Sequence, residues 1–346
     1  SENSINAREG DGVWALPNGE DYYKHRLRIY TTTDLTADEI HSLGLELVDE
    51  IQTQIINILV SEGYDIERPL SDIFVELNND PRFLFEDSDE GRQAILDEYT
   101  RINEETYKML PDYFNELPEA KVVVKRIPIF SEQSAAGGYY ERSSLDGSRP
   151  AAWFANLYDI KATQTFGMPA LSFHEAVPGH HLQIALNQEN KNQTLWNKFG
   201  YTTSAFTEGW ALYAERLAIE AGLVTDPYDM IGSLQSELFR AARLVVDTGI
   251  HSKKWTREKA IKYMMDNAGQ VRSAAESEIE RYIVWPAQAT AYMVGRIKIL
   301  ELRKKAKGQL GNRFNIKDFH SAVLMNGVLP LTVLEAVIDK YIVENS

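Results

Sequence analysis

An interrupted helix pattern at residues 173–183 constrains how this chain can fold. The segment reads FHEAVPGHHLQ and places three of the chain's seven histidines beside one acid and a Pro-Gly pair. In an unbroken helix, two histidines four residues apart share a face and can ligate zinc. Here Pro178 stands four residues after His174. Because proline removes a backbone hydrogen bond and glycine permits unusual dihedral angles, a helix through this segment must be interrupted.

The interruption decides which histidine can join His174 as a metal ligand. A two-residue bulge would return His180 to the face of His174, with Glu175 still directed at the metal. His181 shares that face on a regular helix, but it lies on the order of 10 Å further along the axis. The pattern therefore favours His180, with His181 as the alternative. The simpler interpretation is a polar helix end that binds no metal.

A third ligand is predicted on the next helix, whose sequence at residues 207–218 is TEGWALYAERLA. Glu208 is the first acid on it, and with His174 and His180 it would hold one Zn²⁺ per chain and leave a position open for water. Glu215 lies on the same face and suits a carboxylate that orients a ligand histidine. The alternative for Glu208 is an acid in the first turn that the helix dipole favours. The alternative for Glu215 is a solvated acid on the helix surface.

Glu175 is the predicted general base of a peptide hydrolysis. It would take a proton from the water that attacks the peptide carbonyl and pass it to the leaving amine. His251 is a predicted donor to the oxyanion of the tetrahedral intermediate. The alternative at this position is an intrahelical pair between Arg243 and Asp247, with His251 at a solvated helix end.

Three motifs in a fixed order resemble the bacterial family catalogued as domain of unknown function 885. They are residues 174–181 (HEAVPGHH), 206–215 (FTEGWALYAE) and 243–251 (RLVVDTGIH). That family is similar to the gluzincin metallopeptidases, so the resemblance implies a zinc peptidase. It covers most of the chain, from about Gly12 to beyond Tyr292. Members are usually longer, which implies that this chain is the C-terminal part of such a protein.

The gluzincin resemblance also implies a tyrosine near the oxyanion. Tyr292 or Tyr282 would supply it, and Arg281 or Arg296 would hold a substrate carboxylate. Tyr282, Tyr292 and Arg296 belong to a stripe at helical spacing, and an aromatic stripe of this kind is more often part of a core.

A small β-sheet is predicted just before the metal-bearing helix. Residues 121–124 and 151–157 have strand-like patterns, and residues 137–140 are predicted as a turn. We expect residues 153–157 to form an exposed edge strand that pairs with a peptide substrate, with Asn156 donating to the substrate backbone. An ordinary structural strand is the alternative.

The rest of the chain is predicted to be helical, so the expected fold class is mainly α, or α+β with one small sheet. Thr36 and Glu39 indicate a capped helix start, and the apolar positions that follow at helical spacing indicate a core-facing helix. We expect a helical lobe at residues 1–120 and a catalytic region with the sheet at residues 121–346. One continuous domain is the alternative.

Composition limits the partners. The 51 acidic and 36 basic residues give a net charge of −15, which argues against binding to nucleic acid or to an anionic membrane surface. No apolar run is long enough to span a bilayer. Members of the family resemble exported proteins or lipoproteins, which favours an exported or periplasmic location. The alternatives to a peptidase are a non-catalytic module that binds peptides or envelope polymers, and a zinc amidase or esterase.

Overall fold

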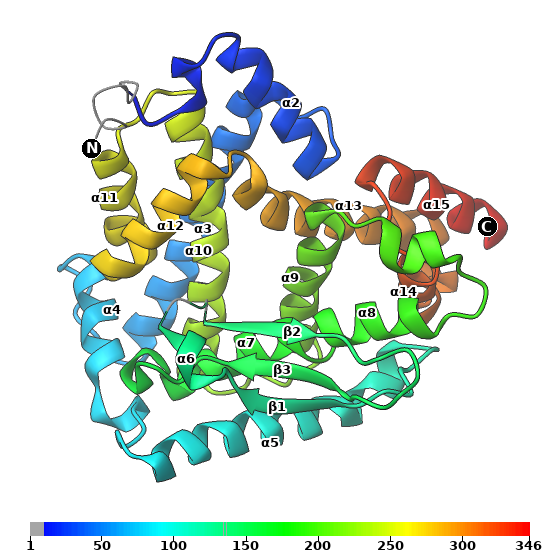
Figure 1. Cartoon of the computed structure of the whole chain (residues 1–346), viewed down its shortest axis with the longest axis horizontal. Helices are drawn as coiled ribbons and strands as arrows, with labels where there is room; N and C mark the ends of the chain where they lie inside the picture. Colours follow the sequence, from blue (N-terminus) through cyan, green and yellow to red (C-terminus); the bar gives the residue numbers. More distant parts are fainter. Residues whose placement is uncertain (1–9, 134, 136) are drawn as a thin grey trace. The chain divides into compact units, whose positions relative to one another are not determined.

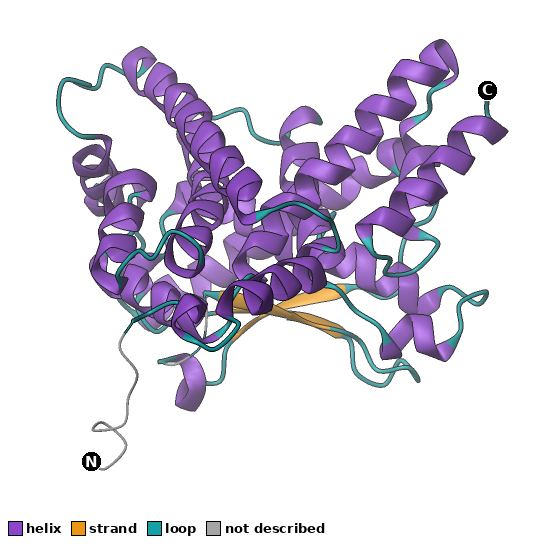
Figure 2. Cartoon of the chain, turned by 90° about the horizontal axis from the view of Figure 1, so that it is seen from above, coloured by secondary structure: helices purple, strands orange, loops and turns teal. Residues whose placement is uncertain are grey.

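The computed structural model describes residues 10–133, 135 and 137–346. Helices make up most of these residues, and the strands form one small sheet (Figures 1 and 2). The prediction of a mainly α fold with a small sheet ahead of the metal-bearing helix is confirmed. None of the helices in these residues has both the length and the apolar character needed to cross a bilayer.

The chain divides into two compact units, and each is assembled from two stretches of sequence. Unit 1 comprises the described residues of Ser1–Val75 and Glu237–Val294, and unit 2 comprises those of Glu76–Ser236 and Gly295–Ser346. These units differ from the expected lobes at residues 1–120 and 121–346. Three helices continue from one unit into the other, namely α4 (Leu70–Asn79), α10 (Pro227–His251) and α13 (Ala291–Leu310).

Unit 1 is helical, and α3 (Ala37–Ser61) illustrates how its sequence specifies it. The Thr36 side chain accepts a hydrogen bond from the Glu39 backbone N–H at 3.2 Å, and the Glu39 carboxylate accepts one from the Thr36 N–H at 2.8 Å. This is the predicted capping box. Of the five apolar positions predicted to face the core, Ile51, Ile55 and Leu59 are fully buried, and Leu43 and Leu47 are half-buried. The other elements are η1 (Val13–Ala15), α2 (Gly19–Thr31), α11 (Arg257–Ala268), α12 (Arg272–Val284) and η6 (Gln288–Thr290).

Unit 2 contains the sheet, which consists of β1 (Val122–Arg126), β2 (Gly138–Glu141) and β3 (Ala151–Ala155). The strand order is β1-β3-β2, with β3 parallel to β1 and antiparallel to β2. Because β3 is paired on both sides, the prediction that residues 153–157 form an exposed edge strand is wrong. The predicted turn at residues 137–140 is also wrong, since Tyr139 and Tyr140 extend and pair with β3 as aromatic residues favour.

The helix α5 (Asp89–Tyr113) packs along the sheet in unit 2, below β1 in Figure 1. Its Tyr99 ring meets the buried Trp153 of β3 edge to face, with centroids 4.2 Å apart. Phe173 of α7 (Met168–Glu175) belongs to the same hydrophobic cluster. The sheet and α5 together therefore fix the position of α7, which carries the first candidate ligand.

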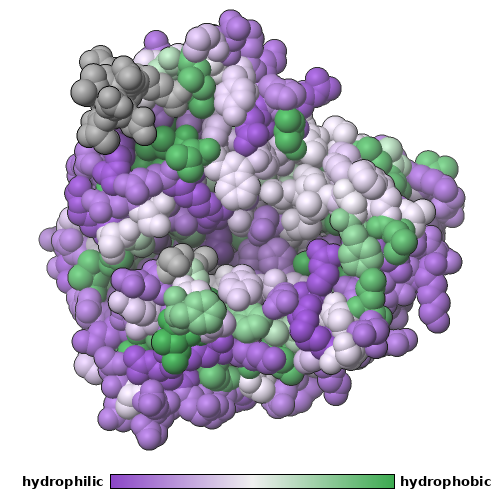
Figure 3. All heavy atoms as spheres, viewed as in Figure 1, coloured by the Kyte–Doolittle hydropathy of each residue, from purple (hydrophilic) through white to green (hydrophobic). Residues whose placement is uncertain are grey.

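The remaining elements of unit 2 surround this core. Besides α8 (His180–Glu189) and α9 (Ser204–Glu220), they are η2 (Pro81–Phe83), α6 (Ile129–Glu132), η3 (Ile160–Ala162), η4 (Thr165–Gly167), the π-helix η5 (Trp196–Gly200), η7 (Gly311–Arg313), α14 (Ile316–Leu324) and α15 (Leu331–Glu344). On the face shown in Figure 3, hydrophilic side chains predominate and hydrophobic ones gather in small patches, in keeping with the large net charge.

Two glycines allow α9 and the unit 2 part of α13 to approach closely. A Cβ atom on Gly295 would lie 1.9 Å from the carbonyl oxygen of Ala205, and one on Gly209 would lie 2.6 Å from the Cα of Gly295. No side chain larger than hydrogen fits at either position without displacing the helices. Since Gly209 follows Glu208, this crossing also sets the position of a candidate ligand.

Replacing Gly295 with alanine should destabilise the protein. The added methyl group must push α9 and α13 apart, which we expect to lower the free energy of unfolding by about 1–3 kcal/mol. Gly308→Ala is the matched control on α13, because a Cβ there meets no atom within 4 Å; it should stabilise by about 0.5–1 kcal/mol through helix propensity. Urea unfolding measures both, and equal effects of the two substitutions would contradict the tight crossing.

Candidate metal centre

The histidine motif forms two helices joined by a short link. The helix α7 ends at Glu175 and α8 begins at His180, so the expected single helix with a two-residue bulge is wrong. The link spans residues 176–179 and contains a cis peptide bond between Val177 and Pro178. The indole N–H of Trp210 on α9 donates to the Pro178 carbonyl at 2.9 Å and fixes the link from the side. Because Pro178 has no N–H to donate, the helix ends before it and starts again after it.

Gly179 allows α8 to begin directly against the end of α7. A Cβ atom on Gly179 would lie 2.0 Å from the carbonyl oxygen of His174 and 2.3 Å from that of Phe173. Only glycine permits this approach. As a result His180, the next residue, lies beside His174, with ring centroids 4.7 Å apart and planes at 86°.

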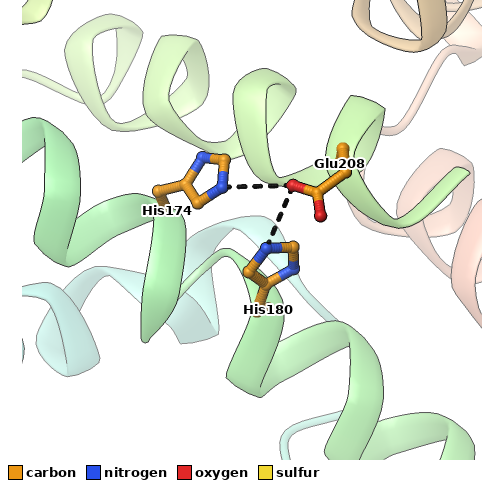
Figure 4. A group of neighbouring side chains, drawn as sticks. All are labelled: His174, His180 and Glu208. Atoms are coloured by element: carbon orange, nitrogen blue, oxygen red, sulfur yellow. Dashed lines mark ion pairs between the residues drawn. The ribbon is translucent and has the colours of Figure 1, made fainter. Parts of the chain in front are cut away.

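The structure brings together the three residues predicted as metal ligands. Nε2 of His174 lies 3.4 Å from Oε2 of Glu208, and Nε2 of His180 lies 3.3 Å from the same oxygen. All the candidate ligand atoms lie within 4.8 Å of one another. Figure 4 shows both imidazole rings directed at one carboxylate oxygen. The three residues come from three helices, since Glu208 lies on α9.

A second carboxylate orients His174. Oε1 of Glu215 lies 2.7 Å from Nδ1 of His174, and the Ser236 hydroxyl donates to Oε2 of Glu215 at 2.9 Å. A proton on Nδ1 is thereby directed at Glu215, which leaves Nε2 to face Glu208 and His180. Glu215 thus lies where an orienting carboxylate was predicted, two turns after Glu208 on α9.

The charges of this cluster favour a cation between its carboxylates. Burial lowers the pKa of His174, but Glu208 and Glu215 outweigh burial and raise that pKa to about 9. Burial likewise raises the pKa of Glu208, but His180 and His174 outweigh it and lower the pKa well below its usual range. At neutral pH we therefore expect the metal-free chain to hold a proton on His174 beside the ionised carboxylate of Glu208.

Glu175 is the residue after His174 and the last residue of α7. Its side chain is 8% exposed, and its carboxylate has no hydrogen-bond or ion-pair partner among the residues that the structure describes. A carboxylate this deeply buried is normally paired, because an ionised group loses its hydration on burial. An unpaired acid beside a candidate metal centre is available for proton transfer.

His181 has a structural role, which answers the question of which histidine joins His174. Its Nε2 donates to the Ala120 carbonyl at 2.9 Å, so its Nδ1 accepts from the Tyr140 hydroxyl at 3.1 Å. The side chain is fully buried, and burial lowers its pKa to about 4, so the ring is neutral at neutral pH. Both ring nitrogens tie α8 to the segments around the sheet, and His181 is absent from the ligand cluster.

His251, the predicted oxyanion donor, is buried in unit 1. Its Nδ1 accepts from the Val13 backbone N–H at 3.1 Å, and its Nε2 donates to the Tyr282 carbonyl at 3.0 Å. Its exposed fraction is 1%, so the alternative of a solvated helix end is wrong. The predicted pair between Arg243 and Asp247 is wrong too. Asp247 accepts instead from the Tyr23 hydroxyl at 2.6 Å and from the Ala287 backbone N–H at 3.1 Å.

The other predicted site residues also have partners of their own. In unit 1, Arg243 donates to the Tyr282 hydroxyl at 2.8 Å, and Arg281 donates to the Gln288 amide at 2.7 Å and to the Tyr292 hydroxyl at 3.5 Å.

In unit 2, the amide of Asn156 donates to the carbonyls of Glu132 and Ala135, at 2.9 and 3.1 Å, so it fastens the segment after β3.

Sequence reasoning missed Trp210 and Ser236. Both lie on helices next to the motif, but a pattern along one helix does not show which helix its side chains meet.

Comparison with known proteins gives a family and a fold. Residues 2–338 match a family described as bacterial protein of unknown function, DUF885. No curated protein matches the chain.

Among the solved structures that are similar to the chain, two are putative lipoproteins. The putative lipoprotein from Colwellia psychrerythraea is 40% identical with a TM-score of 0.96, over 99% of this chain and 58% of that one. A putative lipoprotein of unknown function from Shewanella oneidensis is 21% identical, with a TM-score of 0.81, and shares the fold. The match covers 97% of this chain and 62% of that one. This chain thus spans less than two thirds of either relative.

The stability of the metal-free protein should depend on the titration of His174. Its folded pKa of about 9 exceeds the ordinary value of 6.5, so its contribution to stability is complete below pH 6.5 and is lost as the pH rises through 9. Urea unfolding at a series of pH values and histidine NMR would measure this. Glu208→Gln should lower the pKa of His174 and reduce the slope. A wild-type pKa at or below 6.5 would contradict the described electrostatics.

Proposed function

This chain belongs to the bacterial family of unknown function DUF885, and we propose that it is a zinc-dependent metallopeptidase. The observation that carries the proposal is the convergence of His174, His180 and Glu208 beside the unpaired carboxylate of Glu175. Two imidazoles and one carboxylate form a ligand set of catalytic zinc that leaves one position open. Calcium and magnesium prefer shells made of oxygen, so the two imidazoles favour zinc.

The spacing of the candidate ligands fits zinc. Two atoms that each lie about 2.0–2.1 Å from a tetrahedral zinc ion are roughly 3.3–3.4 Å apart. The two imidazole nitrogens lie 3.4 and 3.3 Å from the Glu208 oxygen. Glu208 and Glu215 raise the pKa of His174, so this position attracts positive charge. A metal cation would take over that role.

The residues divide the work of the reaction. Zinc, when bound, would polarise the substrate carbonyl and make the attacking water more acidic. Glu175 takes the proton of that water and passes it to the nitrogen of the leaving amine. Glu215 and Ser236 keep Nε2 of His174 directed at the centre. Both ring nitrogens of His251 already have backbone partners, so His251 has no part in this mechanism, whereas Tyr292 stays a predicted donor to the oxyanion.

A peptide substrate is supported by the edge of the sheet next to α7. The strand β2 pairs with β3 on one side, and in the described part of the chain no strand pairs with its other side. It also packs against α7, the helix that carries His174 and Glu175. An extended peptide can add to such an edge through backbone hydrogen bonds. We therefore assign to β2 the docking role expected at residues 153–157.

The location proposed for the full-length protein follows from its relatives. Two similar structures are putative lipoproteins, one of them 40% identical to this chain. We propose that the full-length protein is exported and lipid-anchored. Its substrates would then be peptides outside the cytoplasm.

Metal content tests the centre directly. Protein purified without a metal-affinity tag should contain about one zinc per chain by elemental mass spectrometry. His174→Ala and Gly179→Ala should both lose it, the first by removing a ligand and the second by forcing His180 away. His25→Ala is the control, because His25 is an exposed histidine of unit 1. Wild-type protein that stays metal-free after zinc is offered and dialysed would overturn the proposal and favour a non-catalytic binding module.

Activity tests the role of Glu175. Glu175→Gln should keep its zinc and lose about 10²–10⁴-fold in the rate of peptide hydrolysis, because the amide cannot accept the proton of the water. A peptide library with mass-spectrometric detection of products measures this. Zinc-loaded wild-type protein that cleaves simple amides or esters, and no peptide, would replace the peptidase with an amidase or esterase.

A further inference from the structure

A pocket of about 270 Å³ opens in unit 2 between α5, α7 and the segment after β3. Tyr99 of α5 lines one side, and Gly167 and Leu171 line another. Sites that enclose a whole small molecule usually measure roughly 300–1,000 Å³. This pocket therefore suits a single side chain of a larger ligand.

The pocket lies next to Glu175. Leu171 and Glu175 are four residues apart on α7, so they share one face of that helix, and Gly167 immediately precedes it. Leu171 is about 6 Å from Glu175 along the helix axis. Burial raises the pKa of the Tyr99 phenol, and the nearby carboxylate of Glu175 raises it further. Tyr99 therefore lies close enough to Glu175 for the two groups to interact electrostatically. A side chain in the pocket would thus belong to a residue close to the reacting carbonyl.

Tyr99 offers the pocket an unused polar group. The residue is 3% exposed, and its hydroxyl has no hydrogen-bond partner in the described part of the chain. Because Tyr99 lines the pocket, a group bound there can reach this hydroxyl. A donor on the ligand would supply the missing partner.

The charge of the pocket lining favours a positively charged hydrogen-bond donor on the ligand. Its described lining contains Glu132 and Asp159 and no lysine, arginine or histidine. Arg126 neutralises Glu132 through two hydrogen bonds of 2.7 and 2.8 Å. Asp159 is exposed and has no such counter-ion among the described residues; its carboxylate accepts a backbone N–H of Lys161 at 3.1 Å. The uncompensated charge in the described lining is therefore the negative charge of Asp159.

We infer that this pocket receives a lysine-like cationic side chain of the peptide substrate. The inference rests on the proposed peptidase function, since it makes the pocket a specificity pocket for a residue beside the scissile bond. The ammonium group would donate to the Tyr99 hydroxyl and lie near the negative charge of Asp159. The methylene groups of the side chain would pack against Leu171.

Binding of two small amides tests the inference separately from catalysis. L-lysine amide and L-norleucine amide differ in the terminal ammonium group, and titration calorimetry on the zinc-loaded protein would compare them. We expect lysine amide to bind about tenfold more tightly. Gly167→Leu should abolish this preference by filling the pocket, since a Cβ there meets no atom within 4 Å. Gly308→Leu, on the exposed part of α13, is the matched control and should leave it unchanged.

The outcomes separate the pocket from the reaction. Equal affinity for the two amides, or binding of neither, would overturn the inference whatever the enzymatic activity. The same preference in His174→Ala, which lacks a ligand, would support a pocket that acts independently of the metal. If wild-type protein prefers lysine amide but hydrolyses no peptide, the pocket stands and the proposed peptidase function fails. If it is active, peptides with lysine next to the cleaved bond should show about tenfold higher kcat/KM than those with norleucine.

Discussion

The close approach of Gly179 to the carbonyl groups at the end of α7 is the constraint on which the candidate centre depends. It lets one helix start where another stops, so His174 and His180 lie side by side although a proline separates them. The Trp210 indole holds the link from α9, the same helix that supplies Glu208. One helix therefore both positions the histidine pair and completes the group.

The cluster is electrostatically organised as well as packed. Two carboxylates, Glu208 and Glu215, contact opposite nitrogens of the His174 ring, and Ser236 holds the second carboxylate in place. Glu175 alone among the acids of this cluster has no hydrogen-bond or ion-pair partner in the described residues. The paired acids fix geometry, and the unpaired one remains available to exchange a proton.

Sequence patterns predicted the features that depend on neighbouring residues, such as helix starts and helical spacing. They failed for features that depend on contacts between distant segments. Helical spacing and residue chemistry identified His174, His180 and Glu208, and capping rules located the start of α3. Strand order depends on long-range pairing, so the central position of β3 was not predictable from its own residues. Arg243 and Asp247 are one turn apart, yet each finds a better partner elsewhere in unit 1.

The division of unit 2 into two separated stretches of sequence sets an order on biosynthesis. All three candidate ligands lie in Glu76–Ser236, whereas Gly295, against which Gly209 packs, belongs to the second stretch, Gly295–Ser346. The ribosome therefore releases the ligands well before the helix that supports Glu208 has been made. The chain cannot reach the final packing of this candidate centre until α13 has been made.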